Sequence, residues 1–187
     1  IRYIPIHIMN HIWKSFKVGF NQFSCYTQSE FLSAVGHISS TSKSQEQSHF
    51  DKVRINLPDS IDWREKGVVN PIRNQGFCGS CWAFATIQAC ESAYAISHGN
   101  LFKCSIQNLI DCCDGQCEGC FGGLEYEALD YILNKQNGFL NSDDLYPYTQ
   151  KDGDCKFDAS QGINQIKSYV HGIEGDEEYL KQLVSQG

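Results

Sequence analysis

Apolar and polar positions along the chain predict one long helix and several shorter elements. Residues 81–97 are apolar on nearly every side, which is typical of a helix buried on several faces. Ser80 is a favourable N-cap residue and Gly99 follows the stretch, so we expect the helix to begin and end there. Further helices are predicted over residues 105–110, 125–133 and 178–187.

The first fifty residues have a weaker pattern. Residues 18–23 alternate weakly and favour a short strand. Thr27 and Glu30 precede the apolar pair Phe31 and Leu32 with the spacing of a helix capping box. Residues 39–48 are polar without exception and rich in Ser and Gln, which indicates an exposed linker. Such linkers are preferred sites of proteolytic cleavage, so we expect a processing site there.

Composition narrows the class of protein. The chain is 41% hydrophobic and 20% charged, which is typical of a globular protein. It has no run of about 18 apolar residues, so we expect no membrane-spanning helix. A net charge of −7 argues against nucleic acid as a partner. Ten cysteines in 187 residues indicate an oxidising environment, so we expect a lysosome-like compartment or secretion.

Charge and cysteine are divided unevenly along the chain. Residues 1–56 carry a net charge of +3, whereas residues 57–187 carry −10 and nine of the ten cysteines. This division indicates a small basic segment joined to a larger, acidic, cysteine-rich domain. Residue 1 is Ile and the last residues resemble the inside of a protein, so we expect a fragment at both ends, with any targeting signal hidden.

The chemistry is concentrated between Asn74 and Phe84. Cys81 stands in the first turn of the long predicted helix, where the partial positive charge of the helix N-terminus favours a thiolate. Gln75 lies six residues upstream on a glycine-flanked turn, from which its amide can reach the same place. A nucleophile, an amide donor and a backbone N–H are the groups that acyl transfer requires.

These residues resemble a known family. Residues 78–82 read C-G-S-C-W, the signature around the nucleophile of papain and the cathepsins. Further blocks resemble the same cysteine peptidases in the same order: D-W-R-E-K-G at 62–67, N-Q-G at 74–76, C-F-G-G at 120–123 and Y-P-Y at 146–148. The resemblance spans residues 57–187. Residues 21–31 resemble the inhibitory prosegment of the family, with Cys25 where that pattern has Asp.

The resemblance implies a fold and a domain order. The fold class is α+β and papain-like, here mainly the N-terminal helical domain with its central buried helix. Residues 1–36 would be a partial inhibitory prosegment, residues 37–56 a linker with a processing site, and residues 57–187 the N-terminal part of the catalytic domain. The β-rich second domain of the family is expected to be missing from this chain.

The resemblance also implies an activity, a cysteine endopeptidase that cleaves peptide bonds through a thioester acyl-enzyme. Cys81 would be the nucleophile, and Gln75 with the Cys81 N–H would bind the oxyanion. Gly79, Gly122 and Gly123 would contact substrate backbone, although Gly122 and Gly123 also fit the reading of ordinary loop glycines. Expected partners are protein or peptide substrates and the chain's own prosegment as intramolecular inhibitor, with no cofactor or metal.

The resemblance assigns some of the cysteines. It implies disulfides Cys78–Cys120 and Cys112–Cys155. The other four cysteines of the second part stay unassigned: Cys90, Cys104, Cys113 and Cys117.

The chain departs from the family at the catalytic base. The family places a histidine and an asparagine about 130–150 residues after the cysteine, whereas this chain ends 106 residues after Cys81. None of its six histidines is expected to substitute: His7, His11, His37, His49, His98 and His171. Loss of the base in a comparable serine triad costs about six orders of magnitude in turnover. We therefore predict that the 187-residue chain by itself is inactive.

Three other interpretations remain. Cys78 and Cys81 form a C-x-x-C pair, but a thioredoxin-like site needs a βαβ context that the pattern does not show. The same pair with Cys117 and Cys120 suggests a zinc module, although the 35 intervening residues exceed the usual spacing of about 15–20. The third interpretation is a non-catalytic or truncated papain-like homologue that acts as an interaction protein.

Overall fold

The computed structural model describes residues 10–11, 15–35, 57–173 and 175–187. The chain divides into two compact units, residues 1–32 and 33–187, and each is described by itself. The linker predicted over residues 37–56 and its processing site lie outside the described residues. In the described part of the chain, no helix is long and apolar enough to cross a membrane.

The strand predicted over residues 18–23 is wrong, because asparagine side chains hold this backbone in irregular turns. Asn10 bonds both backbone groups of Val18, donating from Nδ2 to the carbonyl at 2.7 Å and accepting from the N–H at 2.5 Å. Asn21 Oδ1 accepts from the N–H of Phe23 at 2.9 Å. Such local side-chain bonds compete with the backbone ladder that a strand needs.

The capping box is confirmed at the start of helix α2 (Gln28–Val35), which crosses the boundary between the two units. The Thr27 N–H donates to Glu30 Oε2 at 2.7 Å, and the Glu30 N–H donates to Thr27 Oγ1 at 3.3 Å. The backbone bond from Thr27 is the largest cause that lowers the pKa of Glu30 below its ordinary value. Two otherwise unpaired N–H groups are thereby satisfied.

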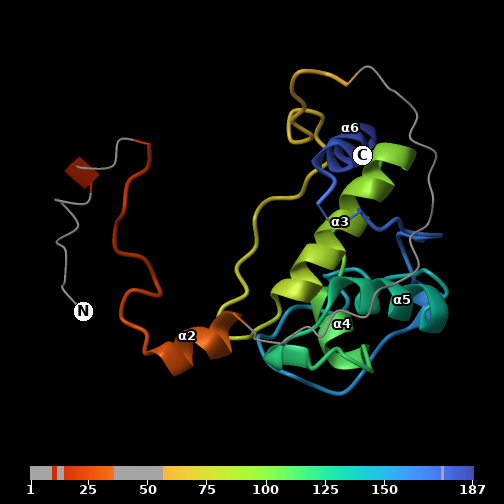
Figure 1. Ribbon diagram of the computed structural model, residues 1–187. Coiled ribbons are helices and arrows are strands. Elements are labelled where there is room, and N and C mark those ends of the chain that lie inside the picture. Colours follow the sequence, from red (N-terminus) through yellow and green to blue (C-terminus); the bar gives the residue numbers. More distant parts are fainter. Residues whose placement is uncertain (1–9, 12–14, 36–56, 174) are drawn as a thin grey trace. The chain divides into compact units, whose positions relative to one another are not determined.

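The larger unit is built around α3 (Cys81–His98), with α4 and α5 packed beside it (Figure 1). The remaining elements, in chain order, are α4 (Ile106–Cys112), η1 (Gly119–Phe121), α5 (Glu125–Lys135), η2 (Ala159–Gln161) and α6 (Glu177–Gln186). The described residues contain no strand, only isolated bridges between Cys104 and Ser142 and between Leu140 and Ile163. The predicted class, the helical domain of a papain-like fold, is confirmed by this architecture and by the comparisons below.

The core lies where α3, α4 and α5 meet. Trp82 and Ile87 of α3, Leu109 of α4 and Ile132 of α5 are all almost fully buried. The predicted burial of α3 on several sides is therefore correct, but one stripe is exposed. It runs along the helix at intervals of four residues, which places its members on one face: Cys81, Ala85, Ala89 and Ala93.

The sequence predicted the C-terminal end of α3 correctly but not the role of the residue before its start. Gly99 has φ 76°, in the left-handed region that favours glycine, and its N–H donates to the Ala95 carbonyl, so the predicted C-terminal end is confirmed. At the other end, the Ser80 side chain makes no capping bond. Its hydroxyl instead donates to the Cys78 carbonyl at 3.3 Å and contacts the Tyr148 hydroxyl at 2.8 Å. Ser80 therefore joins two segments of the site described next.

Three disulfides connect the loops of the larger unit. Cys78–Cys120 and Cys112–Cys155, the two bridges that the resemblance implied, are both present. Cys113 and Cys117, which the sequence left unassigned, form the third. Among the described residues, Cys25, Cys81, Cys90 and Cys104 are free thiols. Burial is the main cause that raises the pKa of Cys90 and of Cys104 to about 12.

Candidate active site

Cys81 is a free and exposed thiol at the first position of α3. The core residue Trp82 follows it and fixes the start of the helix, because its indole is buried and donates from Nε1 to the Gly119 carbonyl at 3.1 Å. As the first residue of the helix, Cys81 has a backbone N–H that no intrahelical acceptor can satisfy. The Cys81 thiol and a backbone N–H that has no intrahelical acceptor therefore meet at one positively polarised helix end.

The side chain of Gln75 points toward the start of α3 from the loop that precedes the helix. Its amide Nε2 donates to the Cys78 carbonyl at 3.0 Å, which directs the side chain toward the start of α3. Tyr148 holds the backbone of this residue, because its hydroxyl donates to the Gln75 carbonyl at 2.6 Å. The ring of Tyr148 packs edge-on against Phe84 of α3 at 5.0 Å between centroids, and burial raises the pKa of its hydroxyl. The sequence indicated Tyr148 only as part of the Y-P-Y motif and did not predict its contact with Gln75.

The end of α2 contributes two backbone carbonyls to this site. Gln75 Nε2 donates to the Ala34 carbonyl at 2.6 Å, and Cys81 Sγ contacts the Val35 carbonyl at 3.3 Å. Ala34 is only 2% exposed, so it fits tightly against its surroundings. Consecutive carbonyls of the predicted prosegment thus accept hydrogen bonds from the two predicted catalytic side chains.

A buried ion pair anchors the loop that carries Gln75. Glu91, in the middle of α3, is almost completely buried and accepts from Arg73 Nη2 at 3.0 and 3.1 Å. The same carboxylate accepts from the Asn70 side chain at 2.8 Å and from the Cys104 N–H at 2.7 Å. Sequence reasoning missed this network. Its only signal was a charged residue within an otherwise apolar helix, where a buried charge needs a partner.

The three glycines predicted to bind substrate lie near the Cys78–Cys120 bridge. The Gly79 N–H donates to the Cys120 carbonyl at 2.8 Å, which joins the loop before α3 to the loop around η1. Gly122 has φ 136°, a conformation that other residues rarely adopt. A Cβ at Gly123 would lie 2.4 Å from Trp82 Cδ2, so packing alone requires glycine there. The role of all three in substrate binding stays a prediction.

Neither described histidine of the larger unit is placed at Cys81. His98 is 17 residues further along the same helix, about 25 Å away at the rise of an α-helix. It stacks on Tyr94 with 4.1 Å between ring centroids. His171 packs against Tyr126 and Tyr169 at 5.9 and 5.1 Å. In the described part of the larger unit, the predicted nucleophile and the predicted oxyanion donors therefore stand without a histidine beside them.

The disulfides contradict two alternative interpretations. Cys78 is bonded to Cys120 and not to Cys81, so the C-x-x-C pair is not a dithiol redox centre. Cys117 and Cys120 are also in disulfides, which removes three of the four thiols that the zinc module would need. No group of potential metal ligands occurs among the described residues.

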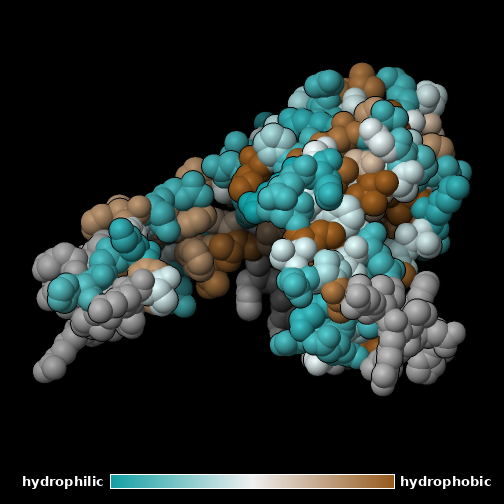
Figure 2. Space-filling view, turned by 90° about the horizontal axis from the view of Figure 1, so that it is seen from above, coloured by the Kyte–Doolittle hydropathy of each residue, from teal (hydrophilic) through white to brown (hydrophobic). Residues whose placement is uncertain are grey.

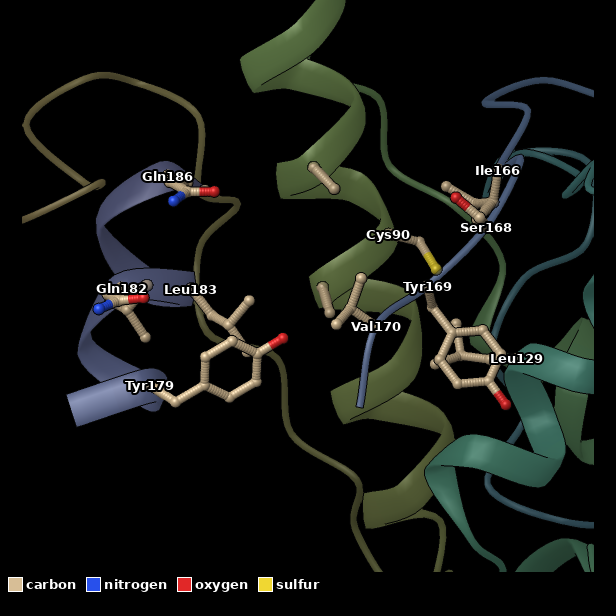
Figure 3. A pocket seen from close by; sticks show the side chains of 14 residues that line it. Cys90, Leu129, Ile166, Ser168, Tyr169, Val170, Tyr179, Gln182, Leu183 and Gln186 are labelled. Carbon is tan, nitrogen blue, oxygen red and sulfur yellow. The ribbon is translucent and has the colours of Figure 1, made fainter. Parts of the chain in front are cut away.

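An apolar cavity of about 690 Å³ lies elsewhere along α3, between that helix, α6 and the segment around Tyr169 (Figure 3). Tyr179 and Leu183 of α6 and Cys90 of α3 line it, and the exposed alanines Ala89 and Ala93 border it. Figure 2 shows apolar side chains at several places on the surface of the larger unit. The cavity is lined mainly by apolar groups and includes neither Cys81 nor Gln75.

Comparison with known proteins places this site in a family. A sequence model described as "Papain family cysteine protease" matches residues 57–187. The chain is 41% identical over 175 residues to "Thiol protease aleurain-like" of Arabidopsis thaliana, covering 91% of this chain and 47% of that protein. It is 36% identical over 173 residues to "Procathepsin L" of Mus musculus, covering 92% and 51%. The chain thus spans about half the length of these relatives.

Solved structures agree. The digestive procathepsin L2 proteinase from Tenebrio molitor larval midgut matches with a TM-score of 0.85 at 31% identity, over 96% of this chain and 61% of that one. The exposed cysteine at the start of the central helix and the glutamine amide beside it lie within the region that the family model matches. The chain belongs to the papain family of cysteine proteases.

Proposed function

We propose that the chain is part of a cysteine endopeptidase precursor. Cys81 attacks the carbonyl carbon of a peptide bond and forms a thioester, while the amine of the departing segment takes up a proton. Water then cleaves the thioester, which releases the acid and regenerates the thiol. The observation that carries this proposal is the placement of Cys81 Sγ and Gln75 Nε2 on two consecutive carbonyls, those of Val35 and Ala34.

Those two contacts support roles for both side chains. Gln75 Nε2 already donates to a peptide carbonyl at 2.6 Å, the bond that an oxyanion-binding amide has to make. The Cys81 N–H, which has no intrahelical acceptor, would supply the second donor. The base that shuttles the proton is, in this proposal, a histidine from outside these 187 residues, because the relatives are about twice as long.

The occupied site also supports a zymogen. With Ala34 buried and bonded to Gln75, a substrate carbonyl has no access to the same amide. We therefore propose that residues 1–36 act as an intramolecular inhibitor and that cleavage within residues 37–56 releases them. Three disulfides support maturation in an oxidising environment, a lysosome-like compartment or outside the cell.

Turnover of a peptide substrate by the native gene product, after processing, tests the proposed function. Cys81→Ala should abolish turnover, and Gln75→Ala should lower kcat by about 10²–10³-fold, the usual loss for one oxyanion donor. Phe102→Ala, beyond the far end of α3, is the matched control and should leave kcat unchanged. Turnover that persists in Cys81→Ala would contradict the proposal, and an inactive native protein would favour the non-catalytic homologue.

A further inference from the structure

Two exposed phenylalanines flank the disulfide beside the nucleophile. Phe77 directly precedes Cys78, and Phe121 directly follows Cys120. Their exposed fractions are 75% and 74%, among the largest of any apolar side chain in the described residues. The two bridged Cα atoms are 4.6 Å apart, so the Cα atoms of Phe77 and Phe121 lie at most about 12 Å from each other. Both rings are therefore within reach of one bound side chain.

Both phenylalanines belong to the two loop segments that meet just before the start of α3. Gly79 and Ser80 separate Cys78 from the start of α3, and the Gly79 N–H donates to the Cys120 carbonyl. Gly122 follows Phe121, and neither glycine has a side chain that would block an approaching peptide. A substrate residue whose carbonyl lay at Cys81 and Gln75 would have its backbone close to these glycines. Its side chain would then have Phe77 and Phe121 as neighbours.

The chemistry of the surface formed by Phe77 and Phe121 favours an apolar occupant. Single exposed apolar residues are ordinary on a protein surface, so exposure alone says little. Two exposed aromatic residues on either side of one disulfide differ, because covering both rings with an aromatic or aliphatic group removes a large apolar area from water. The nearby carboxylate of Asp152 accepts from the Cys120 N–H at 2.7 Å through Oδ1. It keeps its negative charge, so a basic side chain is the competing occupant that the Lys peptide tests.

We propose that Phe77 and Phe121 form an aromatic rim that selects an aromatic or large aliphatic side chain on the substrate residue that supplies the scissile carbonyl. This inference rests on the proposed peptidase function and adds a preference to it. It concerns the side chain next to the cleaved bond and predicts discrimination against a charged group of similar length.

Peptide substrates that differ only at that residue test the rim in the processed native protein. The series carries Phe, Leu, Ala, Lys or Glu there. We expect kcat/KM for Phe and Leu to exceed that for Ala, Lys and Glu by about tenfold or more, the discrimination that an apolar pocket provides. Phe77→Ala and Phe121→Ala should each reduce the ratio of Phe to Ala substrates, and the double variant should bring it near one. Phe102→Ala, the matched control, should retain the full ratio.

The outcomes distinguish failure of the aromatic rim from failure of the proposed peptidase function. No turnover of any peptide by the native protein would contradict the proposed function and this inference together. Turnover with equal kcat/KM across the series, or a preference for Lys, would contradict the rim alone. A preference for Phe that survives in the double variant would also contradict it. Turnover of the Ala substrate that is kept in the double variant shows that the loss is one of selectivity and not of folding.

Discussion

At the scale of single residues, the chain holds thiols in two kinds of environment. Cys81 is exposed at the start of α3, whereas Cys90 and Cys104 are buried in the core. Cys104 Sγ also accepts from Asn164 Nδ2 at 3.2 Å. The sequence motif identified Cys81 and Gln75 as candidates. It could not identify the carbonyls of Ala34 and Val35, because these partners are backbone groups brought in from more than forty residues away.

This difference predicts the pattern of thiol alkylation. With iodoacetamide at pH 8, Cys25 and Cys81 should react in the folded chain, whereas Cys90 and Cys104 should react only in denaturant. Burial raises the pKa of both buried thiols to about 12, so almost none is ionised at pH 8. Peptide mass spectrometry locates the adducts, and equal reactivity of Cys90 and Cys81 in the folded chain would contradict the account.

The same burial gives a pH dependence of stability. Unfolding returns both thiols to a pKa of about 8.5, so the unfolded state loses these protons first as the pH rises. Their contribution to stability should therefore be complete below about pH 8.5 and decline above it.

At the scale of elements, α3 carries both the nucleophile and the anchor of the loop before it. The apolar pattern predicted the course of this helix, and Gly99 predicted its end, because both depend on local sequence. The ion pair between Glu91 and Arg73 was not predicted, since nothing in the pattern connects residues 18 positions apart in a loop and a helix. The strand predicted over residues 18–23 failed for a local reason, the bonds from Asn10 and Asn21.

Breaking the ion pair between Glu91 and Arg73 should strongly lower the free energy of unfolding. Glu91→Gln leaves Arg73 without its counter-charge, and losing one partner of a buried pair costs about 3–5 kcal/mol of the free energy of unfolding. Glu178→Gln is the matched control, because Glu178 and Lys181 form an exposed pair worth at most about 1 kcal/mol. Urea unfolding measures both changes. Equal losses in the two variants would show that the buried pair does not anchor the loop.

At the scale of the whole molecule, the fold joins a helical domain of the papain family to the end of a segment that occupies its site. The order of motifs predicted the domain, because the family blocks lie far apart in the sequence yet in a fixed succession. The boundaries predicted near residues 36 and 57 remain predictions, since residues 36–56 lie outside the described part. The third disulfide, Cys113–Cys117, could not be predicted from the sequence, because cysteine pairing depends on which loops meet in space.

The contact between Cys81 Sγ and the Val35 carbonyl predicts that the end of α2 slows, without preventing, the alkylation of Cys81 in the 187-residue chain. Ala34→Glu should raise the rate of Cys81 alkylation, because a charged side chain does not fit a position that is 2% exposed and should displace the end of α2. Phe20→Glu serves as the control, since Phe20 is 79% exposed and should leave the rate unchanged. Equal rates in Ala34→Glu and the parent chain would argue against an inhibitory contact.

The central claim is that Cys81 and Gln75 together form the acylation centre of a peptidase, and trapping the acyl-enzyme tests it most directly. The processed native protein is mixed with a peptide ester, quenched in acid within a fraction of a second and analysed by mass spectrometry. The account predicts one acyl group on the peptide that contains Cys81, none in Cys81→Ala and much less in Gln75→Ala. An acyl group on another residue, or ester cleavage that continues without Cys81, would contradict it.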